Sequence, residues 1–175
     1  LNDFSTVEIN NTFYQLPEKK TLQIWSDKTP EDFIFSIKAS RYITHLKKLN
    51  EPEEAVEKFF GRIEAVKEKA GPMLFQLPPN WKVNTERLEN FLNMLPEGYR
   101  YTFEMRNETW FKDEIYELLK ERNAAFCVYH IEGRMAPVKT TADFSYIRLH
   151  GTDGKYQGSY NDEELKMWKG SIEKK

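Results

Sequence analysis

Short runs in which apolar and polar residues alternate recur six times along the chain, separated by longer runs with helical spacing. Alternation with a period of two is typical of a strand that buries one face. The runs predict strands at Thr6–Asn10, Phe33–Ala39, Met73–Leu77, Tyr101–Arg106, Phe126–His130 and Tyr146–His150. The chain is thus predicted to alternate short strands with longer segments.

Between the predicted strands, apolar residues recur every three to four positions, as on the buried face of a helix. Such stripes cover residues 55–66, 88–95, 115–119 and 165–172. Ahead of the last stripe, Asn161 and Glu164 have the spacing of a capping box at a helix N-terminus. Because parallel neighbouring strands need a crossover connection, strands that alternate with helices favour a parallel sheet. The pattern predicts an α/β fold.

Each predicted strand has one apolar face and one partly polar face. In the first strand, for example, Val7 and Ile9 alternate with Glu8. An open doubly wound sheet makes its strands apolar on both faces, because helices cover both. A barrel strand instead turns one face toward helices and the other toward an interior that opens at the strand C-termini. The pattern favours a TIM barrel, with an open sheet as the alternative.

A TIM barrel has eight strand–helix units, and about six are visible in this chain. We therefore expect one strand before Leu1 and one after Lys175 to be missing. No linker, low-complexity stretch or change of composition marks a domain boundary. Residues 1–175 are predicted to form a single domain that makes up most of one TIM barrel.

Composition narrows the classes of function. The chain of 175 residues has 26 Lys and Arg against 28 Asp and Glu, a net charge of −2. Its bulk charge therefore does not indicate nucleic-acid binding, although a local basic patch stays open. The single cysteine, Cys127, excludes an internal disulfide, fits a reducing compartment and is predicted to be a buried, inert thiol. With no apolar run long enough to cross a membrane, we expect a cytoplasmic protein without a membrane partner.

Five motifs, in order along the chain, resemble a known family. They are VEINNTFYQLP, DFIFSIKASRYITHLKKL, GPMLFQLPPNW, FEMRNETWF and ADFSYIRLHG, the last followed by YQGSY and Trp168. From Val7 to about Trp168 the chain is similar to the YecE-like family, also called domain of unknown function seventy-two. The resemblance implies a TIM barrel with an earlier strand carrying a Gly-Trp-Tyr-type motif and a later strand ending in paired asparagines, both absent here. It implies no reaction and no catalytic residues.

Polar residues at the ends of the predicted strands form one candidate site, because TIM-barrel sites are built from the C-terminal ends of several strands. The predicted catalytic residues are Glu8, Glu104 and His150. The residues predicted to bind substrate are Asn10, Lys38, Arg41, Gln76, Arg106, His130 and Arg148. Carboxylates can serve as general acid and base, and Arg and Lys match phosphate or carboxylate groups. The alternative is a buried network whose members only neutralise one another.

This set predicts an enzyme that binds and turns over a small phosphate- or carboxylate-bearing substrate. No cofactor is expected, since the chain has no Walker sequence or dinucleotide fingerprint, and it also lacks a nucleophile elbow and a His-Glu-x-x-His motif. Glu8 and Glu104 would also suit a glycosidase if their carboxylates lie about 5–10 Å apart. The substrate and the oligomeric state are not identified by the sequence.

Three other classes of function stay open. A nucleic-acid-binding or nuclease-like module would use the basic segment Arg41–Lys48, which includes His45, together with nearby aromatic side chains. A metal-dependent hydrolase or isomerase would use the ligands Glu8, Glu104, His130 and His150. Cations in the same set disfavour a bound divalent metal, and no metal ligand is assigned. A sensor would bind the ligand without turnover.

Overall fold

All six predicted strands are present, with small differences in their bounds. The computed structural model describes residues 3–154 and 156–173. Contacts group the chain into a first unit, residues 1–110, and a second unit, residues 111–175. Among the described residues, no helix has both the length and the apolar character that crossing a membrane requires.

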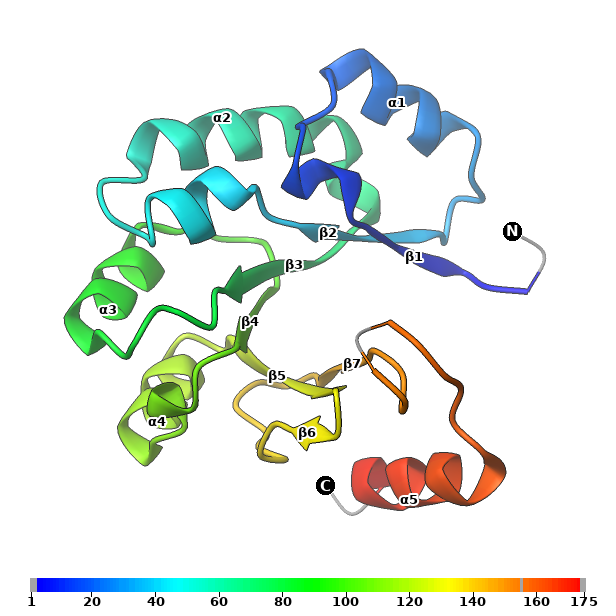
Figure 1. The fold of residues 1–175 in the computed structure, drawn as a ribbon. Helices are drawn as coiled ribbons and strands as arrows, with labels where there is room; N and C mark the ends of the chain where they lie inside the picture. The colour runs from blue at the N-terminus through cyan, green and yellow to red at the C-terminus, as the bar shows by residue number, and fades with distance from the viewer. Residues whose placement is uncertain (1–2, 155, 174–175) are drawn as a thin grey trace. The chain divides into compact units, whose positions relative to one another are not determined.

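The first unit is built on four parallel strands that lie side by side in chain order (Figure 1). They are β1 (Thr6–Ile9), β2 (Ile34–Lys38), β3 (Ala70–Leu77) and β4 (Tyr101–Met105). The helices are α1 (Lys19–Asp27), α2 (Glu53–Ile63) and α3 (Thr85–Met94). Shorter helical turns are η1 (Asn11–Phe13), η2 (Tyr42–Leu46), η3 (Glu64–Lys69) and η4 (Glu108–Trp110). Parallel pairing with helical crossovers agrees with the predicted α/β pattern.

Aromatic side chains fill the space between this sheet and its helices. Phe75 on β3 stacks on Phe103 on β4, with ring centroids 5.3 Å apart, and meets Phe91 on α3 edge-on at 5.1 Å. All three rings are buried. The apolar face predicted for these two strands is therefore the face that packs against a helix.

Helix α1 is not among the helices predicted from the sequence, because it has no stripe of apolar residues. Leu22 is its one buried side chain, so its sequence lacks the periodicity of a packed helix. A lysine from η3 fixes its C-terminal end instead: Lys69 Nζ donates to the carbonyl oxygens of Ser26 at 2.6 Å and Thr29 at 2.9 Å. Those carbonyls lie at the end of a helix, where backbone acceptors lack intrahelical partners.

In the second unit, β5 (Ala125–Ile131) pairs in parallel with β7 (Tyr146–Leu149) and antiparallel with β6 (Arg134–Met135). The helices are α4 (Asp113–Glu121) and α5 (Asp162–Glu173). Strand β6 was not predicted; it follows a two-residue hairpin turn at Glu132 and Gly133, both with positive φ. The predicted capping box is confirmed: Asn161 N donates to Glu164 Oε2 at 2.8 Å, and Glu164 N donates to Asn161 Oδ1 at 2.9 Å.

Candidate functional site

The strands of the first unit carry four predicted site residues on one face of the sheet. The register pairs Glu8 with Ser36 and Gln76 with Glu104. Lys38 pairs with Leu74, two positions before Gln76, and so points to the same side. Glu8 is half-buried, and the other three site residues are buried. The predicted shared face is confirmed for Glu8, Lys38, Gln76 and Glu104.

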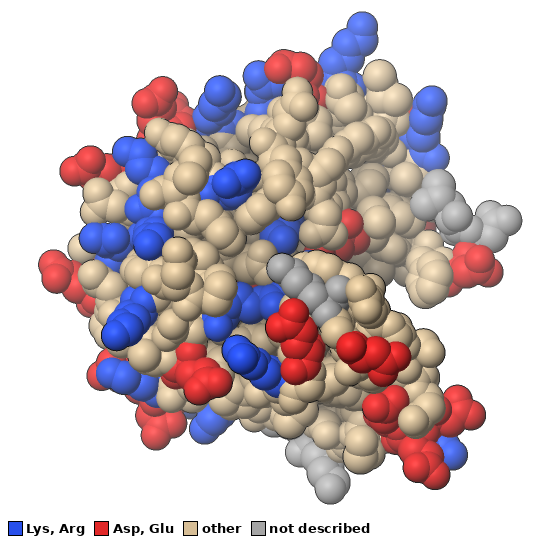
Figure 2. Space-filling model, in the orientation of Figure 1, with Lys and Arg blue, Asp and Glu red and all other residues tan. Residues whose placement is uncertain are grey.

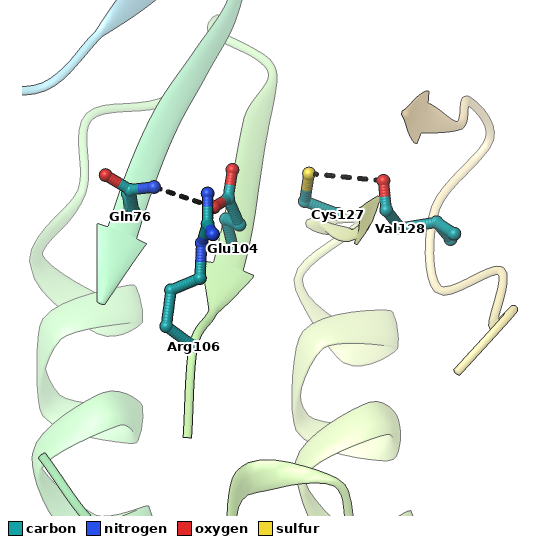
Figure 3. Close-up of polar contacts among 5 residues, drawn as sticks. All are labelled: Gln76, Glu104, Arg106, Cys127 and Val128. Carbon is teal, nitrogen blue, oxygen red and sulfur yellow. Dashed lines mark hydrogen bonds and ion pairs between the residues drawn. The ribbon is translucent and has the colours of Figure 1, made fainter. Parts of the chain in front are cut away.

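Glu104 accepts hydrogen bonds from two other residues of the predicted site. Its side chain is 0% exposed. Gln76 Nε2 donates to Glu104 Oε1 at 2.7 Å, and Arg106 Nε donates to the same oxygen (Figure 3). Arg106 follows β4 and prolongs its pairing, since its backbone N–H donates to the Leu77 carbonyl oxygen at 3.3 Å. A buried carboxylate needs such partners because losing hydration is costly.

Lys38 lies at the end of β2 against the turn η1. Its ammonium nitrogen lies 4.2 Å from the centroid of the Phe13 ring, a cation–π contact. Thr12 Oγ1 donates to the carbonyl oxygen of Lys38 at 2.7 Å and is also within 3.0 Å of the Ile9 carbonyl oxygen. The turn after β1 is thereby held against the end of β2, and the Lys38 side chain is kept in a buried position.

His45 joins this group although it was not predicted as a catalytic or substrate-binding residue. Its ring meets Phe13 edge-on with centroids 4.9 Å apart, and its Nδ1 lies 2.9 Å from Thr44 Oγ1. Burial, followed by the charges of Lys38 and Arg41, lowers the pKa of His45 from 6.5 to about 4; the charge of Glu104 acts weakly in the opposite direction. His45 is therefore neutral near pH 7. The sequence signal was its place in the turn that follows the Lys38 strand.

The turn that carries His45 is wider than an α-helical turn. The backbone N–H of Lys47 donates to the carbonyl oxygen of Tyr42, five residues earlier, at 2.8 Å. Such π-type turns are rare in proteins, and those that do occur are often found at functional sites. Lys48 and Leu49 follow with φ of 49° and 60°, a conformation that side-chain-bearing residues seldom adopt. The turn thus carries His45, with Arg41 directly before it, shortly after the end of β2.

Two predicted residues of the first unit lie at its surface. Asn10 is exposed, and its carbonyl oxygen accepts a hydrogen bond from Phe13 N at 3.1 Å as the chain enters η1. Arg41 is also exposed, although its charge reaches His45. Arg41 thus belongs to the electrostatic environment of the site, whereas Asn10 is placed as a turn residue.

In the second unit, the prediction that His130 and Arg148 share a face is wrong. The register pairs Arg148 with Tyr129 and pairs His130 with Leu149. His130 Nδ1 instead lies 2.7 Å from the hydroxyl oxygen of Tyr160, and its ring is 6.2 Å from that of Trp168 on α5. His130 therefore packs toward a helix of its own unit.

The error in β5 has a physical cause. Residues 125–129 are all buried, so the strand is apolar on both faces and shows no contrast from which its phase can be assigned. Phe126 packs edge-on against Tyr116 of α4 with centroids 5.2 Å apart, which identifies the helix-facing side. Cys127 lies on the other side. Its burial was predicted correctly, and its thiol donates to the Val128 carbonyl oxygen at 3.7 Å (Figure 3).

His150 and Arg148 are the other site residues predicted in the second unit. His150 is buried one residue beyond β7, and its ring meets that of Tyr156 edge-on at 5.1 Å. Arg148 is half-buried on β7. That these two residues join Lys38 and Glu104 in one site stays a prediction.

A metal centre is not assembled by the residues that the structure describes. No three His, Cys, Asp or Glu side chains among residues 3–154 and 156–173 are grouped so that they could hold a metal ion. The alternative ligand set also relied on His130, which contacts Tyr160.

Comparison with known proteins identifies the family. A family model described as protein of unknown function DUF72 matches residues 2–175. The chain belongs to the DUF72 family. UPF0759 protein YecE of Escherichia coli strain K12 is 30% identical over 109 residues, which cover 62% of this chain and 40% of YecE. UPF0759 protein YunF of Bacillus subtilis strain 168 is 25% identical over 203 residues, covering 95% of this chain and 71% of YunF.

Solved structures of DUF72 proteins share the fold. One from Thermotoga maritima has a TM-score of 0.84 and 30% identity, covering 98% of this chain and 73% of that protein. One from Enterococcus faecalis has a TM-score of 0.85 at 17% identity, covering 97% and 73%. The predicted α/β fold, a partial TIM barrel, is thereby confirmed. In the match to YecE, this DUF72 chain spans about two fifths of the relative's length.

Proposed function

We propose that the strand ends of the first unit bind a small phosphate- or carboxylate-bearing molecule and move a proton to or from it. The observation that carries the proposal is the environment of His45, whose pKa burial and the charges of Lys38 and Arg41 lower to about 4. Burial is the largest cause of this shift and penalises a charge of either sign, whereas the part that comes from Lys38 and Arg41 is a positive potential, which favours an anion beside His45.

Lys38, Arg106 and Glu104 each have a distinct role in this proposal. Lys38 supplies a buried point charge for the anion. Arg106 supplies a guanidinium whose position is set by its hydrogen bond to Glu104, and such a fork matches the geometry of phosphate or carboxylate oxygens. Glu104 is then mainly a positioning residue, since its Oε1 already accepts two hydrogen bonds.

Proton transfer is proposed for His45 and Glu8. A neutral imidazole can accept a proton, and a bound anion would raise its pKa toward the range in which general bases work best. Glu8 is half-buried on the same sheet face as Lys38 and Glu104, and it supplies a carboxylate in addition to that of Glu104. His150 and Arg148 of the second unit stay proposed members of the substrate site.

A thermal-stability panel tests the proposal. Phosphate, sulfate and a phosphorylated metabolite should raise the melting temperature more than a neutral sugar does. A ligand at about 100 times its Kd adds roughly 2.7 kcal/mol to the free energy of unfolding. Lys38→Met should abolish the response, whereas Lys28→Met, at an exposed position outside the group, should keep it. The same response in wild type and Lys38→Met would contradict the site.

A second candidate function, nucleic-acid binding, is favoured by one observation. Tyr42 is 48% exposed beside the exposed Arg41, and basic side chains lie on the side of the first unit near α2 and α3 (Figure 2). An exposed aromatic ring next to basic side chains suits a single strand. Affinity for an oligonucleotide would then fall steeply with salt, and Tyr42→Ala would weaken it. Salt-independent binding, or none, would remove this candidate.

A further inference from the structure

A cavity of about 420 Å³ lies in the first unit between η2 and α2. Its volume is in the range of small-molecule sites, about 300–1,000 Å³. It is lined by Leu16, Ser40, Tyr42, Lys47, Glu51, Glu54, Ala55, Lys58 and Phe59. Within η2, Tyr42 belongs to this lining, whereas His45 instead contacts Phe13. The wide turn therefore separates the cavity from the proposed anion site.

Part of the cavity lining is apolar. Leu16 and Ala55 are half-buried and present apolar surface to it, whereas Phe59 is fully buried and exposes no surface of its own. Tyr42 adds a partly exposed ring to the wall. A ligand with an apolar body would gain from leaving water here, because burial of apolar surface is favourable in proportion to its area.

Two acidic and two basic side chains line the cavity. Helix α2 supplies Glu54 and Lys58, and the segment before it supplies Lys47 and Glu51. None of these four side chains forms an ion pair with another described residue. Glu51 is also held at a φ of 43°, a conformation that is uncommon for residues other than glycine and that concentrates at ligand sites. Both signs of charge are thus presented beside apolar side chains in one cavity.

We propose that this cavity binds a small zwitterion with an apolar body, the chemistry of an aromatic or branched α-amino acid. The ammonium group of the ligand faces Glu51 or Glu54, its carboxylate faces Lys47 or Lys58, and its side chain lies against Leu16, Ala55 and Tyr42. Neither an inorganic anion nor a neutral sugar offers this combination. The inference is independent of the proposed anion site, which uses other residues.

Three compounds that share a phenyl ring test the proposal. L-Phenylalanine carries both charges, 3-phenylpropionate lacks the ammonium group, and 2-phenylethylamine lacks the carboxylate. Titrations followed by NMR of the ¹⁵N-labelled chain should show L-phenylalanine shifting amide signals of residues 40–59. Each analogue should bind at least about tenfold more weakly, since each loses a hydrogen bond to a charged group.

Variants place the binding in the cavity. Ala55→Phe should fill the cavity and abolish the shifts, and Lys58→Met and Glu54→Gln, at exposed positions on α2, should each weaken binding by about tenfold without unfolding the chain. Lys28→Met is the matched control and should bind as wild type does. Equal affinity for all three compounds, shifts confined to other residues, or no shifts at all would overturn the proposal. Lys38→Met should leave these shifts unchanged, which separates this test from that of the anion site.

Discussion

The two units use a polar side chain near the end of a strand in different ways. In the first unit, Glu104 accepts hydrogen bonds from Gln76 on the neighbouring strand and from Arg106 beyond its own strand. In the second unit, His130 contacts Tyr160, which precedes α5, and Trp168, which lies on α5. The first arrangement joins strand ends into a charged group, and the second fastens a strand to a helix. The partners of a polar strand residue, rather than its position, indicate whether it belongs to a site.

Of the changes that test this comparison, removal of the Glu104 side chain should lower the free energy of unfolding most. Glu104→Ala leaves Arg106 and Gln76 without their shared acceptor, and removing one partner of a buried ion pair costs about 3–5 kcal/mol. Urea denaturation measures the loss. Glu104→Leu combined with Arg106→Met should cost less than Glu104→Ala alone, because neither member of this ion pair is left charged without the other. A double variant as unstable as the single variant would mean that the charged group is not the cause.

Acid should then test the lowered pKa of His45 in the first unit. Its folded-state pKa of about 4 lies below the value of 6.5 for an unperturbed histidine, so the unfolded chain takes up a proton first as the pH falls. The stabilising contribution of neutral His45 is complete above pH 6.5 and is lost as the pH falls from 6.5 toward 4. His45→Gln should therefore lose less stability than wild type over this interval. Parallel losses in both proteins would contradict the lowered pKa.

The contact between His130 and Tyr160 should have a smaller effect. Burial raises the pKa of Tyr160, so its hydroxyl keeps its proton at neutral pH. His130→Phe and Tyr160→Phe should each lower the free energy of unfolding by about 1 kcal/mol, and the double variant should lose less than the sum. Neither change should alter the response to phosphate. A lost phosphate response in His130→Phe would place His130 back in the substrate site.

Two helix caps, one in each unit, should have effects of a similarly small size. Asn84 Oδ1 accepts a hydrogen bond from Arg87 N at 2.9 Å at the start of α3, as Asn161 does for Glu164 N at α5. Asn84→Ala and Asn161→Ala should each cost about 0.5–2 kcal/mol in thermal unfolding. Asn90→Ala, at an exposed position within α3, is the control and should cost nothing, because alanine favours a helix. A cap variant as stable as this control would show that its cap contributes little.

The features that were predictable from the sequence are those with a visible contrast between faces. Phe75 and Gln76 alternate in a strand with a helix-facing side and a polar side, and their placement was predicted correctly. Helix α1 buries only Leu22, so its bounds could not be read from periodicity.

The remaining features depend on packing in three dimensions. The phase of β5 was missed because both of its faces are buried. His45 was missed as a site member because its pKa depends on burial and on Lys38, which is separated from it by a turn in the chain. Spacing along the sequence carries no direct sign of such an environment.

The wide turn η2 also restricts how this segment of the chain can vary in length. A π-type turn is equivalent to one residue inserted into an α-helical turn, and each residue of an α-helix rotates the chain by about 100°. Deleting one residue between Tyr42 and Leu46 would restore ordinary helical spacing, but Tyr42 and His45 could then no longer keep their present places together. In aligned relatives, substitutions within this turn should therefore be tolerated more readily than gaps.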